Sequence, residues 1–291
     1  MSPANATAPV AVAVVDALRA APSGDEMLRS DPRFTCLKRG PANDTWRVEG
    51  GGLDWIVRVG VGPDDRLAID REREAQLVRL AANAGFAPPI IDVCARRRVL
   101  ICTYLSAAEP DEHRVRCAEF AHQLGRRLRE LHELPVPPGV TALNLRALLQ
   151  HYVDIAAPQH SPVPRSQILA RLDAPLSAYV PAGLALCHHD VHRGNLRLTR
   201  PLTLLDWEYA AWSDPLLDLA SYVSYEHVGT ESVAALLAGY GSRPGIDAAA
   251  LSRAARIFDC LSALWLDAAN GWDALPAAAR AGLCGRLRTP A

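Results

Sequence analysis

Short apolar runs rich in β-branched residues, separated by turn-forming residues, occupy the first third of the chain. Such runs are typical of β-strands, and the glycines at 50–52 between the first two runs indicate a hairpin. The clearest runs are residues 45–48, 55–59, 90–94 and 99–105. One helical segment lies among them, with Asp70 as a plausible N-cap and Gly85 as its end. We expect a small β-rich unit with one helix, preceded by a short N-terminal helix that ends near Ala21.

Beyond residue 110 the apolar positions change to helical spacing. A stripe that includes Leu124, Leu128 and Leu131 predicts a helix over 115–134, ended by the prolines of 135–138. Residues 144–185 should be mostly helical, with breaks at 158–164 and at Pro175, and residues 247–269 carry another amphipathic stripe. The two patterns together predict an α+β protein.

Two short polar motifs stand out in the second half of the chain. The first runs from His188 to Asn195 and has Asp190 at its third position, which is the H-x-D-x-x-x-x-N spacing of a kinase catalytic loop. The second, 204–208, places Asp206 directly after an apolar run. Phosphoryl transfer from ATP needs one carboxylate at the acceptor hydroxyl, and an amide and a second carboxylate on Mg²⁺.

Two plainer interpretations of these motifs are open. His188, His189, Asp190 and His192 are ordinary ligands of zinc or iron, which would suit a metal hydrolase. Alternatively, Asp190 is a turn residue and His188 a satisfied core imidazole. A zinc site needs neither the asparagine at a fixed offset nor the second strand ending in an acid, whereas a kinase needs both.

With these motifs the chain resembles the aminoglycoside phosphotransferase and choline kinase family, which has the protein-kinase-like fold. The segment Asp206-Trp207-Glu208-Tyr209-Ala210 is most similar to the choline, ethanolamine and thiamine kinase members, and residues 214–220 resemble the next family segment. The likeness covers about residues 34 to 225. It implies two lobes: a β-rich nucleotide-binding N-lobe at 1–105, and a mainly helical C-lobe at 106–291.

The resemblance also implies the chemistry of the second lobe, with ATP and Mg²⁺ bound in the cleft. Asp190 would orient the acceptor hydroxyl and take its proton, Asn195 and Asp206 would hold Mg²⁺, and His188 would brace the loop. Asp218 would support the same loop through backbone N–H groups, while Asp214 would cap a helix.

For the first lobe, the resemblance implies nucleotide contacts. Arg58 would bind the phosphates and pair with Glu74, or with Glu72 as the alternative. The loop at 37–44, which includes Asn43, would cover the phosphates, although Gly40-Pro41 departs from the usual pair of glycines. Adenine would meet the backbone of Thr103, Tyr104 and Leu105.

Composition limits the other possibilities. The net charge is −1 and basic residues form no block, so nucleic acid and an anionic membrane surface are not favoured partners. Seven scattered cysteines without a C-x-x-C pair suit a reduced cytosol. No apolar run has the length of a membrane span and no secretory signal is evident, so we expect a cytoplasmic protein; its oligomeric state stays open.

Aromatic side chains concentrate beyond residue 200, and aromatic faces attract cations. The expected partner is therefore a small cationic alcohol such as choline, ethanolamine or thiamine. The candidate substrate contacts are Glu208, Trp207, Trp212, Tyr222 and Trp265. Acids and bases are nearly balanced beyond Ala210, which argues mildly against polycationic aminoglycosides. An aminoglycoside-type activity and a catalytically weak nucleotide-binding regulator, suggested by the Gly40-Pro41 loop, stay as alternatives.

Overall fold

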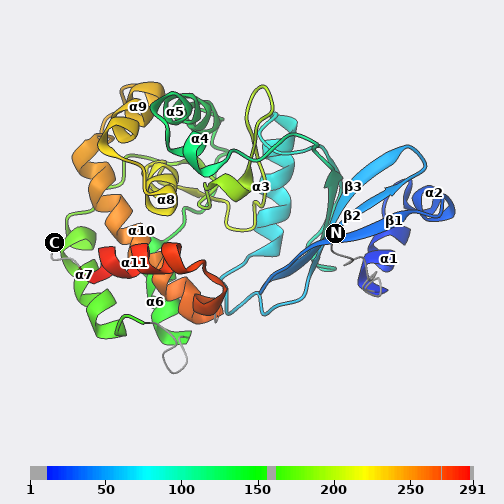
Figure 1. Cartoon of the computed structure of the whole chain (residues 1–291), viewed down its shortest axis with the longest axis horizontal. Coiled ribbons are helices and arrows are strands. Elements are labelled where there is room, and N and C mark those ends of the chain that lie inside the picture. The colour runs from blue at the N-terminus through cyan, green and yellow to red at the C-terminus, as the bar shows by residue number, and fades with distance from the viewer. Residues whose placement is uncertain (1–11, 156–161, 270, 289–291) are drawn as a thin grey trace, which may run out of the picture. The chain divides into compact units, whose positions relative to one another are not determined.

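The computed structural model describes residues 12–155, 162–269 and 271–288, and the chain divides into two compact units (Figure 1). The first unit comprises the described residues up to Asp64 together with Asp70–Ser106. The second comprises Asp65–Ile69 and the described residues from Ala107 onward. The division near residue 106 lies beside the expected one, but the short segment Asp65–Ile69 groups with the second unit. The fold class is the expected one, a small sheet-containing unit and a larger helical unit.

The first unit is built on a five-stranded antiparallel sheet in the order β1-β2-β3-β5-β4. The strands are β1 (Arg33–Arg39), β2 (Asn43–Gly50), β3 (Leu53–Gly60), β4 (Ile90–Cys94) and β5 (Val99–Thr103). Gly50 pairs with Leu53 across the predicted hairpin, whose two turn residues, Gly51 and Gly52, have φ of 59° and 77°. Because a two-residue hairpin of this kind needs positive φ at both positions, the glycines fix its register.

Two short helices pack on this sheet and a third carries polar side chains. Helices α1 (Val12–Arg19) and α2 (Gly24–Arg29) share a core with the sheet. Its members include Val14, Leu18, Met27, Trp46, Val57 and Ile101. Helix α3 (Arg71–Asn83) begins as expected, with the Asp70 carboxylate accepting the N–H of Arg73 at 3.0 Å.

The second unit is mainly helical, with two short two-stranded sheets. Its helices are α4 (Glu112–Arg116), α5 (Ala118–His132), α6 (Leu145–Ile155), α7 (Arg165–Ser177), α8 (Leu216–Glu226), α9 (Thr230–Tyr240), α10 (Ala248–Ala269) and α11 (Ala277–Arg288). β6 (Ala185–Cys187) pairs with β9 (Ala211–Ser213), and β7 (Leu196–Arg197) pairs with β8 (Thr203–Leu204). Among the helices in the described ranges, none combines the length and apolarity that a membrane crossing requires.

Close packing of α5 on α9 depends on two glycines. A Cβ added at Gly125 would lie 2.2 Å from the carbonyl oxygen of Leu236, and one at Gly239 would lie 2.1 Å from that of His122. Only glycine allows the two backbones to approach this closely. This contact holds α5 in place, and α5 carries one of the residues that supports the candidate site.

Three details of the helical prediction were wrong or lie outside the described residues. The helix expected over 115–134 is divided at Cys117, whose ψ of 151° is extended. Helix α7 continues through Pro175, because the proline ring is buried with Ile168 and Leu172 on the helix face that packs into the core. The break expected at 158–161 falls outside the described residues, whereas Pro164 directly precedes α7.

Candidate active site

The loop that follows β6 is held by one buried carboxylate. Asp218, on α8, accepts the backbone N–H of His188 through Oδ2 at 2.9 Å and that of His189 through Oδ1 at 2.6 Å. Its side chain is fully buried. The bracing predicted for Asp218 is therefore confirmed: a single side chain fixes two successive peptide groups at the start of the loop.

Asp218 is in turn held by a buried histidine that the sequence did not reveal. His132, at the end of α5, has Nε2 3.0 Å from Asp218 Oδ2 and Nδ1 3.0 Å from the hydroxyl of Tyr240 on α9. Burial by itself raises the pKa of Asp218, but the hydrogen bond with His132 and the nearby imidazoles outweigh it and lower the pKa to about 2. Asp218 is thus ionised at neutral pH, and each of its two oxygens can accept a backbone N–H.

His188 links the two motifs. Its Nε2 is 2.7 Å from the carbonyl oxygen of Leu205, so Nε2 carries the proton, and its Nδ1 accepts the N–H of Asp190 at 3.2 Å. The ring also packs edge-on against Trp207, with centroids 4.8 Å apart. His188 is therefore a buried brace between the loop after β6 and the segment that carries Asp206.

These contacts disfavour the metal-hydrolase interpretation. Both ring nitrogens of His188 are used within the loop, and Nδ1 of His192 accepts the N–H of Gly194 at 3.1 Å. Within the described ranges, the ligand atoms that converge are those of His132, Cys187 and Asp218, all buried. That set of residues differs from the predicted one. Asp218 and His132 are already hydrogen-bonded to each other, and Asp218 also accepts two N–H groups of the loop.

Asp190 and Asn195 meet directly. The Asn195 amide nitrogen donates to Asp190 Oδ2 at 2.7 Å and to the Asp190 carbonyl oxygen at 3.0 Å. Because the amide nitrogen faces Asp190, the amide oxygen points the other way. Oxygen donors of this kind suit Mg²⁺, so Asn195 could hold the ion and still orient Asp190.

The second predicted metal ligand is tied to the first through the backbone. Leu205 donates its N–H to the carbonyl oxygen of Asn195 at 2.8 Å, and Asp206 follows with φ of 60°. A left-handed backbone is uncommon for aspartate and occurs where the surrounding structure imposes it, often at functional sites. The structure therefore holds the segment that carries Asp206 against Asn195, and the side chain of Asp206 is only partly buried.

Negative charge gathers around this loop. His192 Nε2 is 3.5 Å from Asp190 Oδ2. Burial lowers the pKa of His192, but Asp190, Glu226 and Asp206 outweigh it and raise the pKa. For Asp190, burial raises the pKa, while His192, His188 and the Asn195 hydrogen bond lower it below its usual value. Asp190 is thus ionised and able to accept a proton, beside carboxylates that attract cations.

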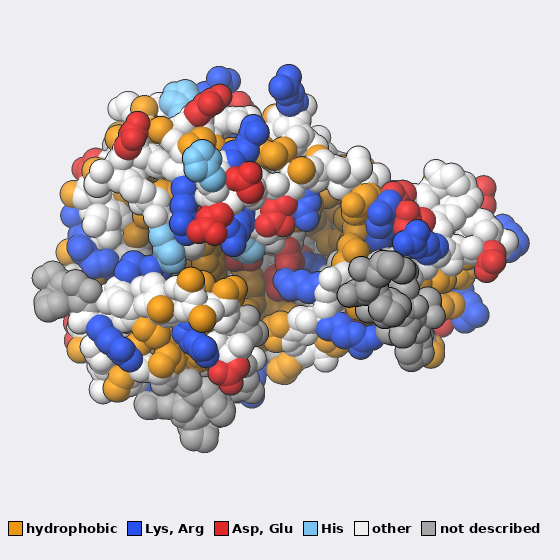
Figure 2. Space-filling model, in the orientation of Figure 1, with side chains coloured by type: hydrophobic (Ala, Val, Ile, Leu, Met, Phe, Trp, Pro, Cys, Tyr) orange, Lys and Arg blue, Asp and Glu red, His pale blue; other side chains and the backbone are white. Residues whose placement is uncertain are grey.

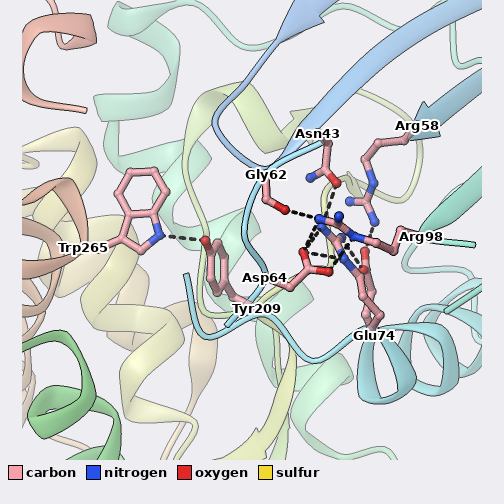
Figure 3. Close-up of polar contacts among 9 residues, drawn as sticks. Asn43, Arg58, Gly62, Asp64, Glu74, Arg98, Tyr209 and Trp265 are labelled. Carbon is pink, nitrogen blue, oxygen red and sulfur yellow. Dashed lines mark hydrogen bonds and ion pairs between the residues drawn. The ribbon is translucent and has the colours of Figure 1, made fainter. Parts of the chain in front are cut away.

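The candidate substrate residues fall into two groups. Trp207, Trp212 and Tyr222 are buried in the second unit; the Trp207 indole donates to the carbonyl of Leu204, and the Tyr222 hydroxyl donates to that of Val115. Trp265 is half-buried and donates from Nε1 to the Tyr209 hydroxyl at 2.7 Å, with the rings edge-on (Figure 3). Glu208, buried beside Tyr209, contributes negative charge there.

Tyr225 lies close to Asp190 although it was not among the candidates. Its ring is 38% exposed and packs edge-on against His192 and Phe258, each with centroids 5.3 Å apart. The only sequence signal was its place in the aromatic-rich region beyond residue 200. Tyr225 therefore adds an aromatic ring beside Asp190.

The face in Figure 2 shows acidic and basic side chains mixed over the second unit near α4. Arg116 and Arg193 both pair with Glu112, at 2.7 and 3.4 Å, and Arg197 lies 4.0 Å from Glu109. Glu112 and Glu109 therefore each have a neighbouring arginine. Such a surface does not favour a polycation.

The first unit contains the predicted ion pair between Arg58 and Glu74, and the alternative partner Glu72 is not needed. The pair is part of a larger network, which the sequence did not reveal (Figure 3). Arg71 contacts Glu74, Asp64 and Asn43, and Arg98 contacts Asp64. Asn43 therefore lies with the Arg58–Glu74 pair.

Two of the three residues whose backbone was expected to meet adenine already use their N–H groups within the first unit. The N–H of Thr103 donates to the carbonyl of Pro89 at 3.0 Å, and that of Tyr104 donates to the carbonyl of Asp54 at 2.9 Å. The Tyr104 ring lies against the guanidinium of Arg47, 3.9 Å from its carbon. Of the three predicted residues, Leu105 is left as the first candidate for an N–H contact.

Comparison with known proteins shows which family model matches the chain and which solved structures share its fold. The model of the phosphotransferase enzyme family matches residues 34–255. A choline/ethanolamine kinase family protein from Mesorhizobium loti is 23% identical, with a TM-score of 0.71 over 95% of this chain and 94% of that one. A choline kinase from Streptococcus pneumoniae is 17% identical, with a TM-score of 0.68 over 84% and 87%.

A spectinomycin phosphotransferase, solved with ADP and spectinomycin, is 15% identical, with a TM-score of 0.54 over 79% of this chain and 81% of that one. No curated protein matches the chain in sequence. At these identities the solved structures establish the fold alone.

Proposed function

The chain belongs to the phosphotransferase enzyme family, and from this premise we propose that it is an ATP- and Mg²⁺-dependent kinase for a small cationic alcohol of the choline, ethanolamine or thiamine type. The observation that carries the proposal is the contact between Asp190 and Asn195 in a loop braced by Asp218. A carboxylate and an amide in this arrangement serve the two needs of phosphoryl transfer, orienting the nucleophile and holding the metal.

The proposed reaction uses Asp190 as the proton acceptor. Oδ2 of Asp190 receives the Asn195 amide, so the acceptor hydroxyl would bind through Oδ1. As the alcohol oxygen bonds to the γ-phosphorus of ATP, the bond from that phosphorus to the bridging oxygen breaks, ADP leaves and Asp190 takes the hydroxyl proton. Asn195 and Asp206 would hold Mg²⁺, which neutralises charge on the phosphates.

Nucleotide contacts are assigned to the first unit. Arg58, held by Glu74, would bind the phosphates through its forked guanidinium. Asn43 lies in the same polar network and would contact the phosphates from the start of β2. Leu105, just beyond β5, would supply the backbone contact to adenine.

The cationic alcohol is supported by aromatic and acidic groups near Asp190. Trp265 and Tyr209 are joined by a hydrogen bond, Tyr225 packs on His192, and Glu208 adds negative charge. Aromatic faces bind quaternary ammonium groups, and a nearby carboxylate strengthens such binding. Trp207, Trp212 and Tyr222 would act through packing, since their side chains are buried.

Mg²⁺-dependent release of ADP from ATP tests the proposal directly. Choline, ethanolamine, thiamine and an aminoglycoside would be assayed separately, each with the wild type and with Asp190→Ala. We expect one of the three simple alcohols to stimulate release in the wild type only. Stimulation by the aminoglycoside alone would favour an antibiotic kinase. ATP binding without release for any acceptor would favour the regulator.

Trp265→Leu tests the cation-binding role of the aromatic side chain. We expect the KM for the best cationic acceptor to rise about thirtyfold, since a desolvated cation–π contact is worth on the order of 2 kcal/mol and each 1.4 kcal/mol is a factor of about ten. The KM for ATP should not change. The neutral control is 2-tert-butylethanol, in which a carbon atom replaces the nitrogen of choline. The wild type should use this alcohol less well, and the substitution should leave its KM unchanged. An equal loss with both acceptors would contradict recognition of charge.

A further inference from the structure

We propose that Arg71 is a positioning residue for the nucleotide, one that fixes Glu74 and Asn43 in the first unit so that Arg58 and Asn43 can meet the phosphates. The inference rests on the proposed function and adds a residue that the family resemblance did not indicate. It concerns how the phosphate-binding groups of this chain are held.

Arg71 is the first residue of α3 and its side chain is 9% exposed. Nη1 donates to Glu74 Oε2 at 2.9 Å, one turn along the same helix. Nη2 donates to Asn43 Oδ1 at 2.9 Å and to Asp64 Oδ1 at 2.7 Å, and Nε is 3.1 Å from the same Asp64 oxygen. One guanidinium thus joins the start of β2, the segment after β3 and the first turn of α3.

Figure 3 shows Asn43, Asp64, Glu74, Arg58 and Arg98 gathered in one cluster of polar contacts. Glu74 uses Oε1 for Arg58 and Oε2 for Arg71, so the rotation of its carboxylate is fixed by two cations. Arg71 likewise fixes the Asn43 amide by binding its oxygen. The predicted phosphate-binding loop and the predicted ion pair are therefore held by the same side chain.

The network brings three arginines together with two acids. Three guanidinium groups, those of Arg58, Arg71 and Arg98, face the carboxylates of Asp64 and Glu74. Asp64 is shared between Arg71 and Arg98, with Arg98 Nε 2.7 Å from Asp64 Oδ2.

Lysine cannot replace Arg71 in this geometry. The acceptors lie in three directions around a planar fork, whereas an ammonium group is a compact point charge that reaches fewer of them. Arg71→Lys keeps the charge and releases Glu74 and Asn43 from their fixed orientations. Any loss of nucleotide affinity in this variant would come from geometry.

The test is the dissociation constant of Mg-ATP, measured by calorimetry, beside the kinetic constants. For Arg71→Lys we expect the Kd and the KM for ATP to rise about tenfold, as for loss of charge-assisted hydrogen bonds, with kcat within about twofold. The KM for the acceptor should not change. The matched control is Arg73→Lys on the same helix, whose side chain is 29% exposed and lies 3.8 Å from Asp70.

A second variant separates positioning from general stability. Asn43→Ala removes one target of Arg71 without changing charge, and we expect it also to raise the Kd. Combined with Arg71→Lys it should add little, because both changes disrupt the same contact.

Three outcomes would overturn the inference. They are a Kd for Arg71→Lys equal to that of Arg73→Lys, full additivity of the two changes, and a fall in Tm without a change in Kd. If the wild type itself fails to bind Mg-ATP, the proposed function fails, which is a different result.

Discussion

Asp190→Ala is expected to lower the turnover number about a thousandfold or more while Mg-ATP still binds. General-base catalysis by a positioned carboxylate contributes about a hundredfold to ten-thousandfold, and in the proposed mechanism Asp190 would also orient the acceptor hydroxyl. Asp190 is ionised at neutral pH because its partners lower its pKa, so the wild type holds the required acceptor. The nucleotide contacts are assigned to other residues, which is why binding should survive.

Asp190→Asn should give the same loss with less disturbance of the loop. An asparagine at this position still offers a side-chain oxygen to the Asn195 amide, which lies 2.7 Å from Asp190 Oδ2 in the wild type. A control for removal of a carboxylate is Asp273→Asn, because the Asp273 side chain is 99% exposed. A folded Asp190→Asn protein with neither turnover nor ATP binding would count against the assigned role, and so would one with wild-type turnover.

Features set by neighbouring residues were predictable from the sequence. The glycine turn at 50–52 and the Asp70 cap each act within a few residues, and both appear in the structure as expected. The spacing from Asp190 to Asn195 is likewise local, so the contact between the two side chains could be anticipated. The divided helix at Cys117 and the uninterrupted helix at Pro175 depend on tertiary packing, which overrides local propensity.

Partners far apart in the sequence were mostly not predictable. His132 meets Asp218 from 86 positions away, and Arg71 reaches Asn43 across 28. No periodicity marks a buried histidine as the partner of a carboxylate on another helix. For the aromatic residues, composition identified a region but could not say that Trp207 is buried while Tyr225 is exposed beside the loop.

Asp218→Ala is expected to lower the free energy of unfolding by about 3 to 5 kcal/mol, as for removal of one partner of a buried ion pair. The substitution leaves the N–H groups of His188 and His189 and the ring of His132 without their buried acceptor. Asp218→Asn should cost less, because its one oxygen can still accept one N–H. Urea unfolding at pH 7 measures both values, and a change below about 1 kcal/mol for Asp218→Ala would contradict the bracing role.

The same carboxylate should make stability depend on pH in the acid range. The pKa of Asp218 is about 2 in the folded protein against an ordinary value of 3.8, so the ionised group stabilises the fold above pH 4. This contribution falls as pH drops through the folded pKa, by about 1 kcal/mol at pH 3 and about 2 kcal/mol at pH 2. The stability difference between the wild type and Asp218→Asn should therefore narrow by these amounts on acidification.

Asp273→Asn provides the comparison, since an exposed carboxylate should give a difference that stays nearly constant with pH. A gap between wild type and Asp218→Asn that is equally constant from pH 7 to pH 3 would mean that folding does not lower the pKa of Asp218. The hydrogen bonds to His132 and to the N–H groups of His188 and His189 would then give the charged carboxylate no advantage over the protonated one.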